Sequence, residues 1–538
     1  MLKKSSSSSA QKYALLSVSN KSMILNLATT LNNLGYTIIS TGGTAKLLTD
    51  NNIPVTPVEK ITGNPESFDG RMKTISFQIE SGILFDRTNK KHVKEAKELS
   101  IVPIDIVICN LYPFEATIAK KGTTIDEAVE NIDVGGPTMI RSAAKNFKNV
   151  LAIVDPADYE SLISNIKNNK LTQSFRQDLA AKAFRHLSFY DSQIANYLSN
   201  IILRSKTKES NNTLFPDEIT LPGRKVTDLR YGENPHQKAA IYMHPNTNSP
   251  MARLQKLWGR DLSLTNVSDI NAGLESVRLF DESAAVIIKH NSPCGIALGE
   301  TSYQALERAI QADPESAFGG VIILNKAVDM PTAKIIGAFK DEKKGNIDIL
   351  SAPGIEKDAL KYLQTVRKSM GIYVFGKIPK KKNYPLNLKW MDGGFMLQEG
   401  DDDIVSGFKD WKVVTKIKPT QKQLEQMQIA WKFISKIKSN SVIIVDKILP
   451  MTRGIGSGQT SRIRSTQIAF QQAGDHAVGA ILASDSFFPF NDSVKLAAKN
   501  KIGAIVQQGG SINDKASIEE ADKAGIPMVL TGRRAFWH

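Results

Sequence analysis

Residues 289–295 (Lys-His-Asn-Ser-Pro-Cys-Gly) combine a cation, an imidazole and a turn signal. They follow the apolar run 284–288, which is short and partly β-branched and therefore predicts a buried strand. Because open α/β sheets bind ligands at the carboxyl ends of strands, Lys289 and His290 would lie where a ligand could meet them. The Pro-Cys-Gly sequence predicts a tight turn, which would hold these side chains in place. One interpretation is a proton-transfer site based on His290. The alternative, which this segment alone leaves open, is a polar loop with an incidental histidine.

Two loops near the start of the chain carry groups suited to binding an anion. Residues 17–21 and 40–44 each join an expected strand to an expected helix. Backbone amides at a helix start, hydroxyl groups and a nearby lysine can together hold a phosphate. The candidate residues are Ser17, Ser19, Lys21, Ser40, Thr41, Gly42, Gly43 and Thr44. The alternative is ordinary helix N-capping by Ser or Thr, but two such loops on consecutive strands favour a shared anionic ligand.

Residues 131–138 (Asn-Ile-Asp-Val-Gly-Gly-Pro-Thr) place a carboxylate, Asp133, beside Gly135 and Gly136. Glycines allow a backbone to approach a ligand closely. Lys145 follows on an expected helix, and together with Asp133 it could move protons. A turn plus a surface ion pair explains the same pattern equally well.

An alternation of strands and helices is expected to position these groups. Residues 13–18, 36–39 and 104–110 predict strands, and apolar residues at helical spacing over 23–34 predict a helix that ends at Gly35. This alternation predicts a parallel, doubly wound α/β sheet. A helix is expected over 170–204. We expect a disordered tail at 1–12, a first domain at 13–204, a linker at 205–220 and a second domain at 221–538.

The second half contains a rough internal repeat. One copy starts at the strand 284–288 and the other at the strand 441–445, and both follow the pattern strand, loop, helix, strand. The two copies resemble each other in pattern and not in residue identity. They predict two similar α/β subdomains at about 221–390 and 391–538.

Composition limits the class of protein. The 538 residues are 41% hydrophobic and 23% charged, which is ordinary for a globular protein, and the net charge is +15. This charge suits anionic small ligands or nucleic acid. The basic residues are scattered, apart from the run 380–382, and do not form a stripe with aromatics, so we expect no nucleic-acid partner. No apolar run approaches the ~18 residues of a membrane helix, and we expect no membrane association.

Cysteine usage bears on metal binding and on the cellular compartment. Cys109 and Cys294 are the only two cysteines, which excludes a cysteine-rich zinc site or a disulfide framework and fits a reducing, cytoplasmic compartment. Pro293-Cys294 is similar to half of a zinc-deaminase motif, but Ala297 stands where the second cysteine ligand would be. We therefore expect no zinc and no other metal.

Taken together, the motifs resemble a known family. The chain is similar over residues 11–538 to the bifunctional enzymes that join phosphoribosylaminoimidazolecarboxamide (AICAR) formyltransferase to inosine monophosphate (IMP) cyclohydrolase. The resemblance rests on residues 17–21, 40–44, 110–114, 131–138, 141–146, 229–237, 289–295, 317–320, 454–462, 484–492 and 531–538.

The resemblance implies a fold, two reactions and an assembly. The first domain would be methylglyoxal-synthase-like, and the second would consist of two cytidine-deaminase-like units. The second would pass a formyl group from the co-substrate 10-formyltetrahydrofolate to AICAR, and the first would close formyl-AICAR to IMP with loss of water. The family implies a homodimer with transferase sites at the subunit interface.

The resemblance also implies roles for individual residues. His290 would take the proton from the attacking amine, and Lys289 would stabilise negative charge and keep His290 neutral. The remaining transferase residues, which would hold AICAR and folate, are Arg230, Tyr231, Gly319, Asp348, Asn440, Arg462, Phe488 and Arg534. The cyclohydrolase site would use Lys73, Tyr112, Asp133 and Lys145, with Arg71, Thr74, Asn110, Gly135, Gly136 and the two anion-binding loops around them.

One segment departs from the family pattern. Where the family has Lys-Thr-Leu-His-Pro-x-x-His, this chain has Lys73 and Thr74 followed by Ile-Ser-Phe-Gln-Ile and Glu80. A carboxylate near a phosphate ligand would weaken its binding. An alternative hypothesis is therefore a formyltransferase whose first domain is catalytically impaired, and a third is a basic nucleic-acid-binding or scaffold protein.

Overall fold

A computed structural model describes residues 11–68, 70–206, 215–339, 346–379, 386–401, 404 and 406–538. The basic run at 380–382, residues 1–10 of the expected tail and 207–214 of the expected linker lie outside these. The chain forms two compact units. Unit 1 comprises Met1–Arg224 and His244–Asn246, and unit 2 comprises Lys225–Met243 and Thr247–His538.

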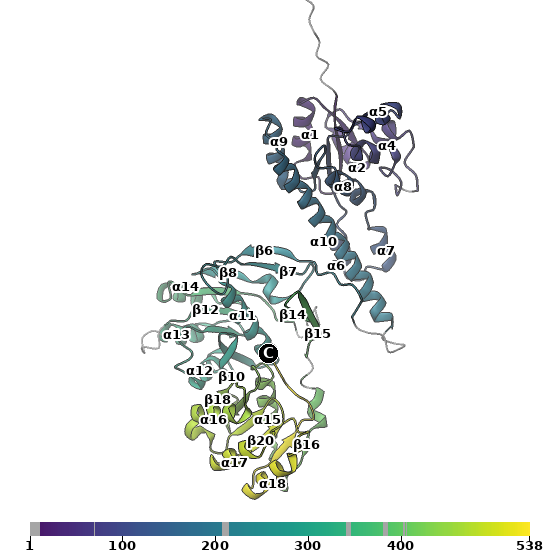
Figure 1. Cartoon of the computed structure of the whole chain (residues 1–538). Helices are drawn as coiled ribbons and strands as arrows, with labels where there is room; N and C mark the ends of the chain where they lie inside the picture. Colours follow the sequence, from purple (N-terminus) through teal and green to yellow (C-terminus); the bar gives the residue numbers. More distant parts are fainter. Residues whose placement is uncertain are drawn as a thin grey trace, which may run out of the picture. The chain divides into compact units, whose positions relative to one another are not determined.

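Unit 1, which begins in the purple part of the chain in Figure 1, is built on a parallel five-stranded sheet of order β3-β2-β1-β4-β5. The strands are β1 (Lys12–Val18), β2 (Tyr36–Ser40), β3 (Thr56–Pro57), β4 (Ile106–Asn110) and β5 (Leu151–Ile153). Alternate residues of the buried strands enter opposite cores, as the period of two in a strand requires. The predicted doubly wound sheet is confirmed.

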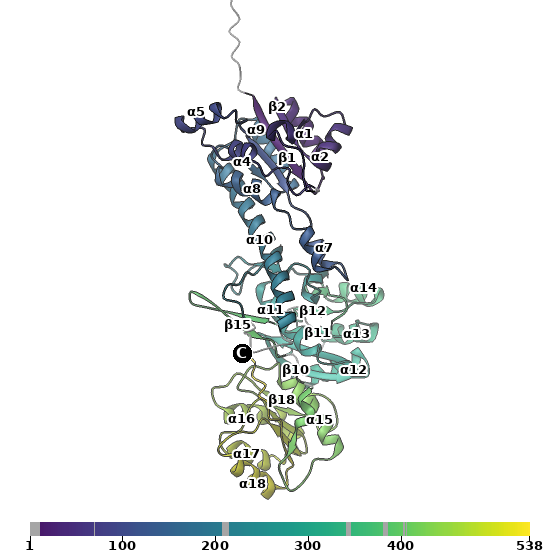
Figure 2. The same ribbon diagram turned by 90° about the vertical axis from the view of Figure 1, so that its right-hand side faces the viewer.

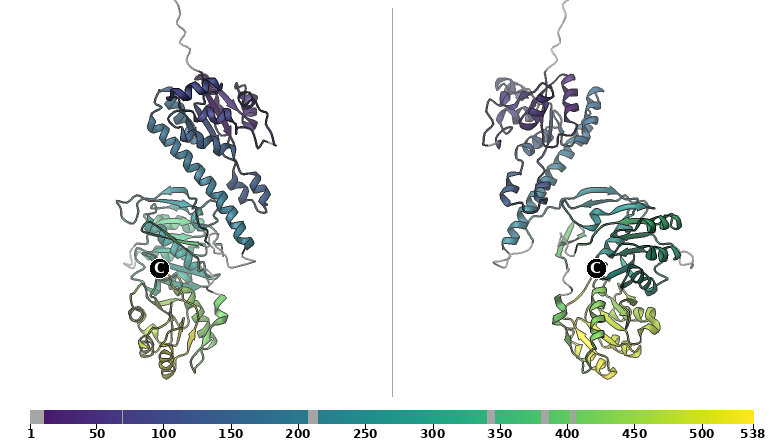
Figure 3. Two further views of the ribbon diagram at one scale, coloured as in Figure 1. Left: turned by 45° about the vertical axis from the view of Figure 1, so that its right-hand side comes forward. Right: turned by 180° about the vertical axis from the view of Figure 1, so that it is seen from behind.

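Helices cover both faces of this sheet. One core contains side chains from α1 (Ile24–Asn33), α2 (Gly42–Asp50) and α9 (Tyr159–Lys167). The other contains side chains from α3 (Val58–Thr62), α4 (Phe77–Leu84), α7 (Ile125–Glu130) and α8 (Gly135–Lys145). The expected long helix is α10 (Gln173–Lys206), which Figure 3 shows as one continuous rod. The remaining helices are α5 (Lys90–Glu98) and α6 (Phe114–Ala119).

Unit 2 contains two six-stranded sheets with the same strand order. The first runs β10-β9-β11-β12-β13-β8 and the second β18-β17-β19-β20-β21-β16. The strands of the first are β8 (Gln255–Trp258), β9 (Ser283–Lys289), β10 (Ser292–Gly299), β11 (Val321–Leu324), β12 (Ile349–Ala352) and β13 (Gly371–Val374). Those of the second are β16 (Lys412–Val413), β17 (Val442–Val445), β18 (Thr452–Gly456), β19 (Ile481–Ser484), β20 (Ala504–Gln507) and β21 (Met528–Leu530).

The internal repeat is thus present, with one correction. Each copy begins with an antiparallel hairpin, β9–β10 or β17–β18, where the sequence predicted a strand followed by a loop. The copies meet through these hairpins, because the amide of Leu298 donates to the carbonyl of Pro450 at 2.8 Å (Figure 2). The helices are α11 (Leu264–Val277), α12 (Ser302–Ala312), α13 (Met330–Ala338), α14 (Lys357–Val366), α15 (Gln421–Ile434), α16 (Arg462–Ala473), α17 (Asp492–Lys499) and α18 (Asp514–Ala524).

A separate hairpin, β14 (Leu386–Met391) with β15 (Gly394–Glu399), belongs to neither large sheet. No helix among the described residues is long and apolar enough to cross a membrane.

Candidate active sites

A cavity of about 610 Å³ in unit 1 lies at the carboxyl ends of β1, β2 and β4. Most of the residues predicted for the cyclohydrolase site line it. They are Ser17, Ser19, Lys21, Thr41, Gly42, Gly43, Thr44, Arg71, Lys73, Thr74, Asn110, Tyr112, Asp133, Gly135 and Gly136. Parallel strands bring loops that are distant in sequence to one edge, which is how residues from 17 to 136 meet in one cavity.

Hydrogen bonds between neighbouring strands fix the two anion-binding loops. The Asn110 side chain accepts the amides of Ser19 and Asn20, both at 2.7 Å, and so ties the first loop to β4. The Thr44 hydroxyl donates to the carbonyl of Val18 at 3.1 Å. The Ser40 hydroxyl donates to the carbonyl of Leu16 at 2.6 Å and is buried, so Ser40 supports the loop without lining the cavity.

The start of α2 presents an unpaired hydroxyl and two cations to the cavity. Thr41 is the N-cap residue, yet its side chain makes no capping bond, and its buried Oγ1 has no hydrogen-bond partner among the described residues. A Cβ placed on Gly42 would lie 3.6 Å from the Lys73 ammonium, and one on Gly43 would lie 3.7 Å from that of Lys21. The N-capping alternative is therefore wrong for this loop. Amides, a hydroxyl and two lysines at a helix start suit a phosphate group.

Asp133 is the buried carboxylate of this cavity. Its Oδ1 accepts the amide of Gly136 at 2.9 Å, and its own amide donates to the Tyr190 hydroxyl at 2.8 Å. Burial raises the pKa of Asp133 above its ordinary value, although hydrogen bonds from the amides of Gly136 and Tyr112 oppose the shift. A carboxyl group with a raised pKa is suited to taking and returning a proton.

Lys145 does not line this cavity. Asp133 precedes α8 and Lys145 is its last residue, so the helix separates them by roughly 16 Å at 1.5 Å per residue. No ion pair joins these two residues in the described part of unit 1, so the alternative of a surface ion pair is not supported.

Glu80, at the position that departs from the family pattern, also lies outside the cavity lining. Its Oε2 accepts the hydroxyl of Ser142 at 2.5 Å, which links α4 to α8. Burial raises the pKa of Glu80, and within the part of the chain that the structure describes its buried Oε1 has no hydrogen-bond partner. The concern that this carboxylate would face a phosphate ligand is therefore not supported.

The sequence interpretation missed several lining residues. They are Val18, Gly70, Val129, Glu130, Ile132, Val134 and Met139. Most belong to or flank the junction of α7 and α8, where the sequence signal was the motif at 131–138, from which only Asp133 and the two glycines were taken as site residues. Arg71, which was predicted, forms an ion pair with Glu130.

In unit 2, His290 and Asn291 form the turn of the β9–β10 hairpin. Both have positive φ angles, 56° and 61°, as tight two-residue hairpin turns require. The turn therefore precedes Pro293, which lies in β10, and the turn predicted at Pro-Cys-Gly is wrong. Lys289 ends β9, and its ammonium donates to the carbonyl of Phe318 at 2.8 Å.

The edge of the sheet at His290 gathers further predicted residues. β9 runs antiparallel to β11, so Lys289 lies beside the start of β11, and Gly319 lies two residues before that strand. Asp348 precedes β12 and pairs with Arg260 at 2.9 Å. This edge of the sheet lies at the amino ends of the parallel strands β11–β13. Lys289 lies at the carboxyl end of β9, so the expectation that ligands bind at the carboxyl ends of strands holds here for β9 alone.

Asp269 on α11, which the sequence interpretation missed, lies at the centre of this group. It accepts the amide of Asn291 at 2.7 Å. Burial raises its pKa, while the hydrogen bond from Asn291 and the charges of His290 and Lys438 lower it. Since Lys438 belongs to the second repeat, both repeats contribute to the surroundings of Asp269.

Arg230 and Tyr231 are held together just before α11. The Arg230 guanidinium lies 4.6 Å from the centre of the Tyr231 ring and donates to its hydroxyl at 3.0 Å. The amide of Arg230 donates to the carbonyl of Leu262, which fixes the pair to the chain entering α11.

The predicted residues of the second repeat lie at the carboxyl edge of its sheet. Arg462 is buried, pairs with Asp485, and donates to Asn440 Oδ1 at 2.8 Å. Phe488 is fully buried in the core, so its ring is not available to a ligand in this conformation. Arg534 stacks on Phe536 at 4.4 Å.

No group of three or more His, Cys, Asp or Glu side chains suited to a metal ion occurs among the described residues. Cys294 is partly buried, and burial raises its pKa to about 12.

Comparison with known proteins gives matches to two family models. Residues 143–472 match the family model described as "AICARFT/IMPCHase bienzyme", and residues 23–138 match "MGS-like domain". A protein of Thermoanaerobacter sp. named "Bifunctional purine biosynthesis protein PurH" is 46% identical over 98% of this chain and 100% of its own length. The chain belongs to the AICARFT/IMPCHase bienzyme family.

A second relative agrees with this membership. The protein of the same name from Persephonella marina is 43% identical over 98% of this chain and 99% of its own length. A solved structure titled "Crystal structure of ForH" matches 35% of this chain at 33% identity, with a TM-score of 0.32. As a member of this bienzyme family, the chain is a bifunctional enzyme of purine biosynthesis with formyltransferase and cyclohydrolase activities. The transferase-only alternative is not favoured, since both parts of the family match.

Proposed function

We propose that unit 2 transfers the formyl group of 10-formyltetrahydrofolate to the amine of AICAR, and that unit 1 closes formyl-AICAR to IMP. The observation that carries the assignment of unit 1 is the convergence of most predicted cyclohydrolase residues on one cavity, where two lysines and an unpaired hydroxyl meet a helix start. The named relatives support the pair of reactions.

In the transfer step, the amine nitrogen of AICAR attacks the formyl carbon and N10 of the folate leaves. His290 takes the proton released by the amine, and Lys289 stabilises negative charge that develops on the formyl oxygen. The hairpin turn holds His290 at a defined point, and the hydrogen bond from Lys289 to the Phe318 carbonyl holds the cation beside it. Arg230 and Tyr231 bind AICAR, with Asn440, Arg462 and Arg534 toward its ribose and phosphate.

In the cyclisation step, the carboxamide nitrogen attacks the formyl carbon and the formyl oxygen leaves as water. Lys21, Thr41 and the start of α2 bind the phosphate. Asp133 removes a proton from the attacking nitrogen and returns it to the formyl oxygen, and the formamide nitrogen releases the second proton of the departing water. Lys73 supplies positive charge near the departing oxygen. The family resemblance also implies a catalytic role for Lys145, which does not line this cavity.

The protein acts on small molecules as a cytoplasmic homodimer in this proposal. The exposed apolar residues of the β14–β15 hairpin support association, because Trp390 is 76% exposed and an isolated hairpin is marginally stable. Sedimentation of the full-length protein should give twice the chain mass of 59.1 kDa.

The assignment is tested by His290→Ala in separate assays of the two reactions. Formyl transfer should fall by about 10²- to 10⁴-fold, the usual effect of losing a general base, while cyclisation of supplied formyl-AICAR stays at the wild-type rate. An equal loss of both activities would show that the reactions are wrongly divided between the units.

A further inference from the structure

A cavity of about 830 Å³ lies at the carboxyl edge of the parallel strands β11, β12 and β13. Asn325 directly follows β11, Pro353 follows β12 and Lys377 comes shortly after β13, and all three line it. None of the residues assigned above to either reaction lines this cavity. It occupies the edge opposite to Lys289 and His290, where α/β sheets most often bind ligands.

The described lining of this cavity is strongly cationic. It contains Arg253, Arg278, Lys326 and Lys377 against one carboxylate, Asp281. The side chain of Arg278 is only 12% exposed, and its Nε is buried without a hydrogen-bond partner among the residues that the structure describes. Arg278 also forms an ion pair with Glu275, whose carboxylate lies 3.8 Å from Nη2. Four cations face one carboxylate in the described lining, and this excess of positive charge favours an anionic ligand.

Apart from Asn248 and Asn325, the rest of the lining is apolar. Its larger members are Val277, Phe280, Pro353 and Ile378, and Phe280 is held by packing on Phe433 at 5.4 Å. Apolar walls beneath a cationic rim fit a molecule with a planar ring and a phosphate group, and the volume lies within the roughly 300–1,000 Å³ of small-molecule sites.

The internal repeat supplies an independent reason to expect a ligand here. Asn325 follows the third strand of the first repeat and accepts the amide of Ala284 at 2.8 Å, at the start of β9. Asp485 follows the third strand of the second repeat and accepts the amide of Ser441 at 3.0 Å, just before β17. The two edges are therefore equivalent. The second carries Asn440, Arg462 and Arg534, which, in the proposed function on which this step rests, bind a nucleotide.

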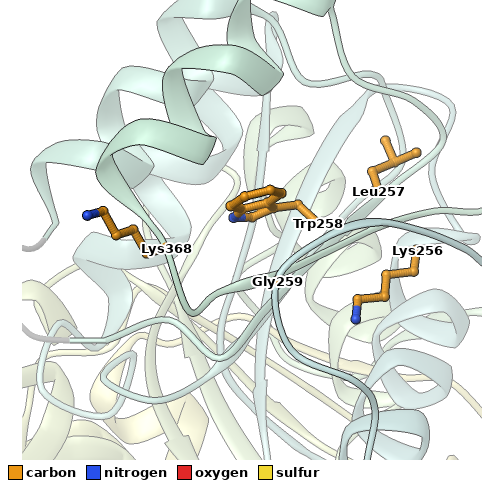
Figure 4. Close-up of a pocket in the computed structure, with 5 residues that line it drawn as sticks. All are labelled: Lys256, Leu257, Trp258, Gly259 and Lys368. Atoms are coloured by element: carbon orange, nitrogen blue, oxygen red, sulfur yellow. The ribbon is translucent and has the colours of Figure 1, made fainter.

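Another cavity in unit 2 does not gather its cations around one point. It is lined by Lys256, Leu257, Trp258, Gly259 and Lys368. Figure 4 shows Lys256 and Lys368 on opposite sides of the Trp258 ring. Lys256 also pairs with Asp261 at 2.6 Å, so the two cations do not converge on one point.

We propose that the cavity at the carboxyl edge of β11–β13 is a nucleotide-binding site, separate from both reaction centres. Arg278 and Arg253 bind the phosphate groups, Lys326 and Lys377 close over them, and the ring packs on the apolar wall.

Lysine footprinting on the full-length protein tests this directly, with ADP as the probe. The rate of acetylation of each lysine is measured by mass spectrometry with increasing ADP. Lys326 and Lys377 should be protected with a common midpoint, while Lys416, an exposed lysine of the second repeat, should react at an unchanged rate. Arg278→Met should raise the ADP concentration at half protection by about tenfold or more, the usual effect of losing a hydrogen bond to a charged group. Arg253→Gln, at an exposed position, should act in the same direction without risk to folding.

Several results would overturn the proposal. They are equal reactivity of Lys326, Lys377 and Lys416 at all ADP concentrations, equal protection by sodium sulfate at matched ionic strength, and no effect of either arginine variant. Protection by triglutamate but not by ADP would overturn the assignment to a nucleotide. Both enzyme activities are measured on the same samples. Normal activities without protection contradict this site alone, whereas protection with absent activities contradicts the proposed function.

Discussion

Arg462 and Asp485 form an ion pair inside unit 2, with side-chain exposures of 6% and 0%. Asp485 also accepts the amide and the hydroxyl of Ser441, both at 3.0 Å, so the pair ties α16 and the end of β19 to the start of β17. Arg462 can therefore position Asn440 and the strand ends as well as contact a substrate.

Replacing Arg462 by methionine should destabilise the protein markedly. The change leaves Asp485 buried without its cation, a loss that typically costs about 3–5 kcal/mol in free energy of unfolding. Urea unfolding followed by tryptophan fluorescence measures the change, and Arg534→Met serves as an exposed control. A loss below about 1 kcal/mol would mean that the pair contributes little to stability.

Thr41→Val tests the phosphate site of unit 1. The variant keeps the shape of the side chain but removes a hydroxyl that has no partner within the described chain. If that hydroxyl binds the phosphate of formyl-AICAR, KM for cyclisation should rise about 10- to 100-fold, with no loss of stability. Ser40→Ala is the matched control, since it removes a structural hydrogen bond to Leu16 and should lower stability instead. An unchanged KM for Thr41→Val would place the phosphate elsewhere.

The raised pKa of Asp133 determines the pH dependence that we expect for cyclisation. Burial raises its pKa, and a base must be ionised to accept a proton. The cyclisation rate should therefore fall as the pH drops through this raised pKa, at a higher pH than an ordinary aspartate would give. Asp133→Asn should lower the rate by about 10²- to 10⁴-fold and remove this limb of the profile, leaving formyl transfer intact. A limb that persists in the variant would belong to another group.

Glu80→Gln tests whether the departure from the family pattern is tolerated. Burial raises the folded-state pKa of Glu80, so its ionisation lowers stability as the pH rises through that pKa. Glutamine can still accept the hydrogen bond from Ser142 without a buried charge. The variant should be more stable than the wild type at neutral pH, and the difference should vanish below the pKa of an unfolded glutamate. Thermal unfolding at pH 4 and pH 7 measures this, and a variant that is less stable at both would show that the charge itself is needed.

The sequence predicted the sheet of unit 1 well because its strands are short apolar runs and its helices have clear spacing. β1, β2 and β4 each lie within one or two residues of their expected limits. The same periodicity brought the loops at 17–21 and 40–44 to one edge, which is why most of the cavity was found.

The features of the fold and of the sites that the sequence did not predict depend on contacts between residues that are distant in the chain. Pro293 predicted a loop, but β10 is at the end of its sheet, where a missing amide donor is tolerated, and it forms a strand. The burial of Arg462 requires Asp485, which lies 23 residues away. Asp269 had no motif of its own, because its role arises only where α11 passes the hairpin turn.

The most direct test of two linked activities uses the purified full-length protein with AICAR and 10-formyltetrahydrofolate, while tetrahydrofolate and IMP are followed separately. The account predicts that tetrahydrofolate and IMP form together in equal amounts, without accumulation of formyl-AICAR. Formation of tetrahydrofolate with accumulating formyl-AICAR would contradict it, because unit 1 would then lack the cyclohydrolase activity assigned to its cavity.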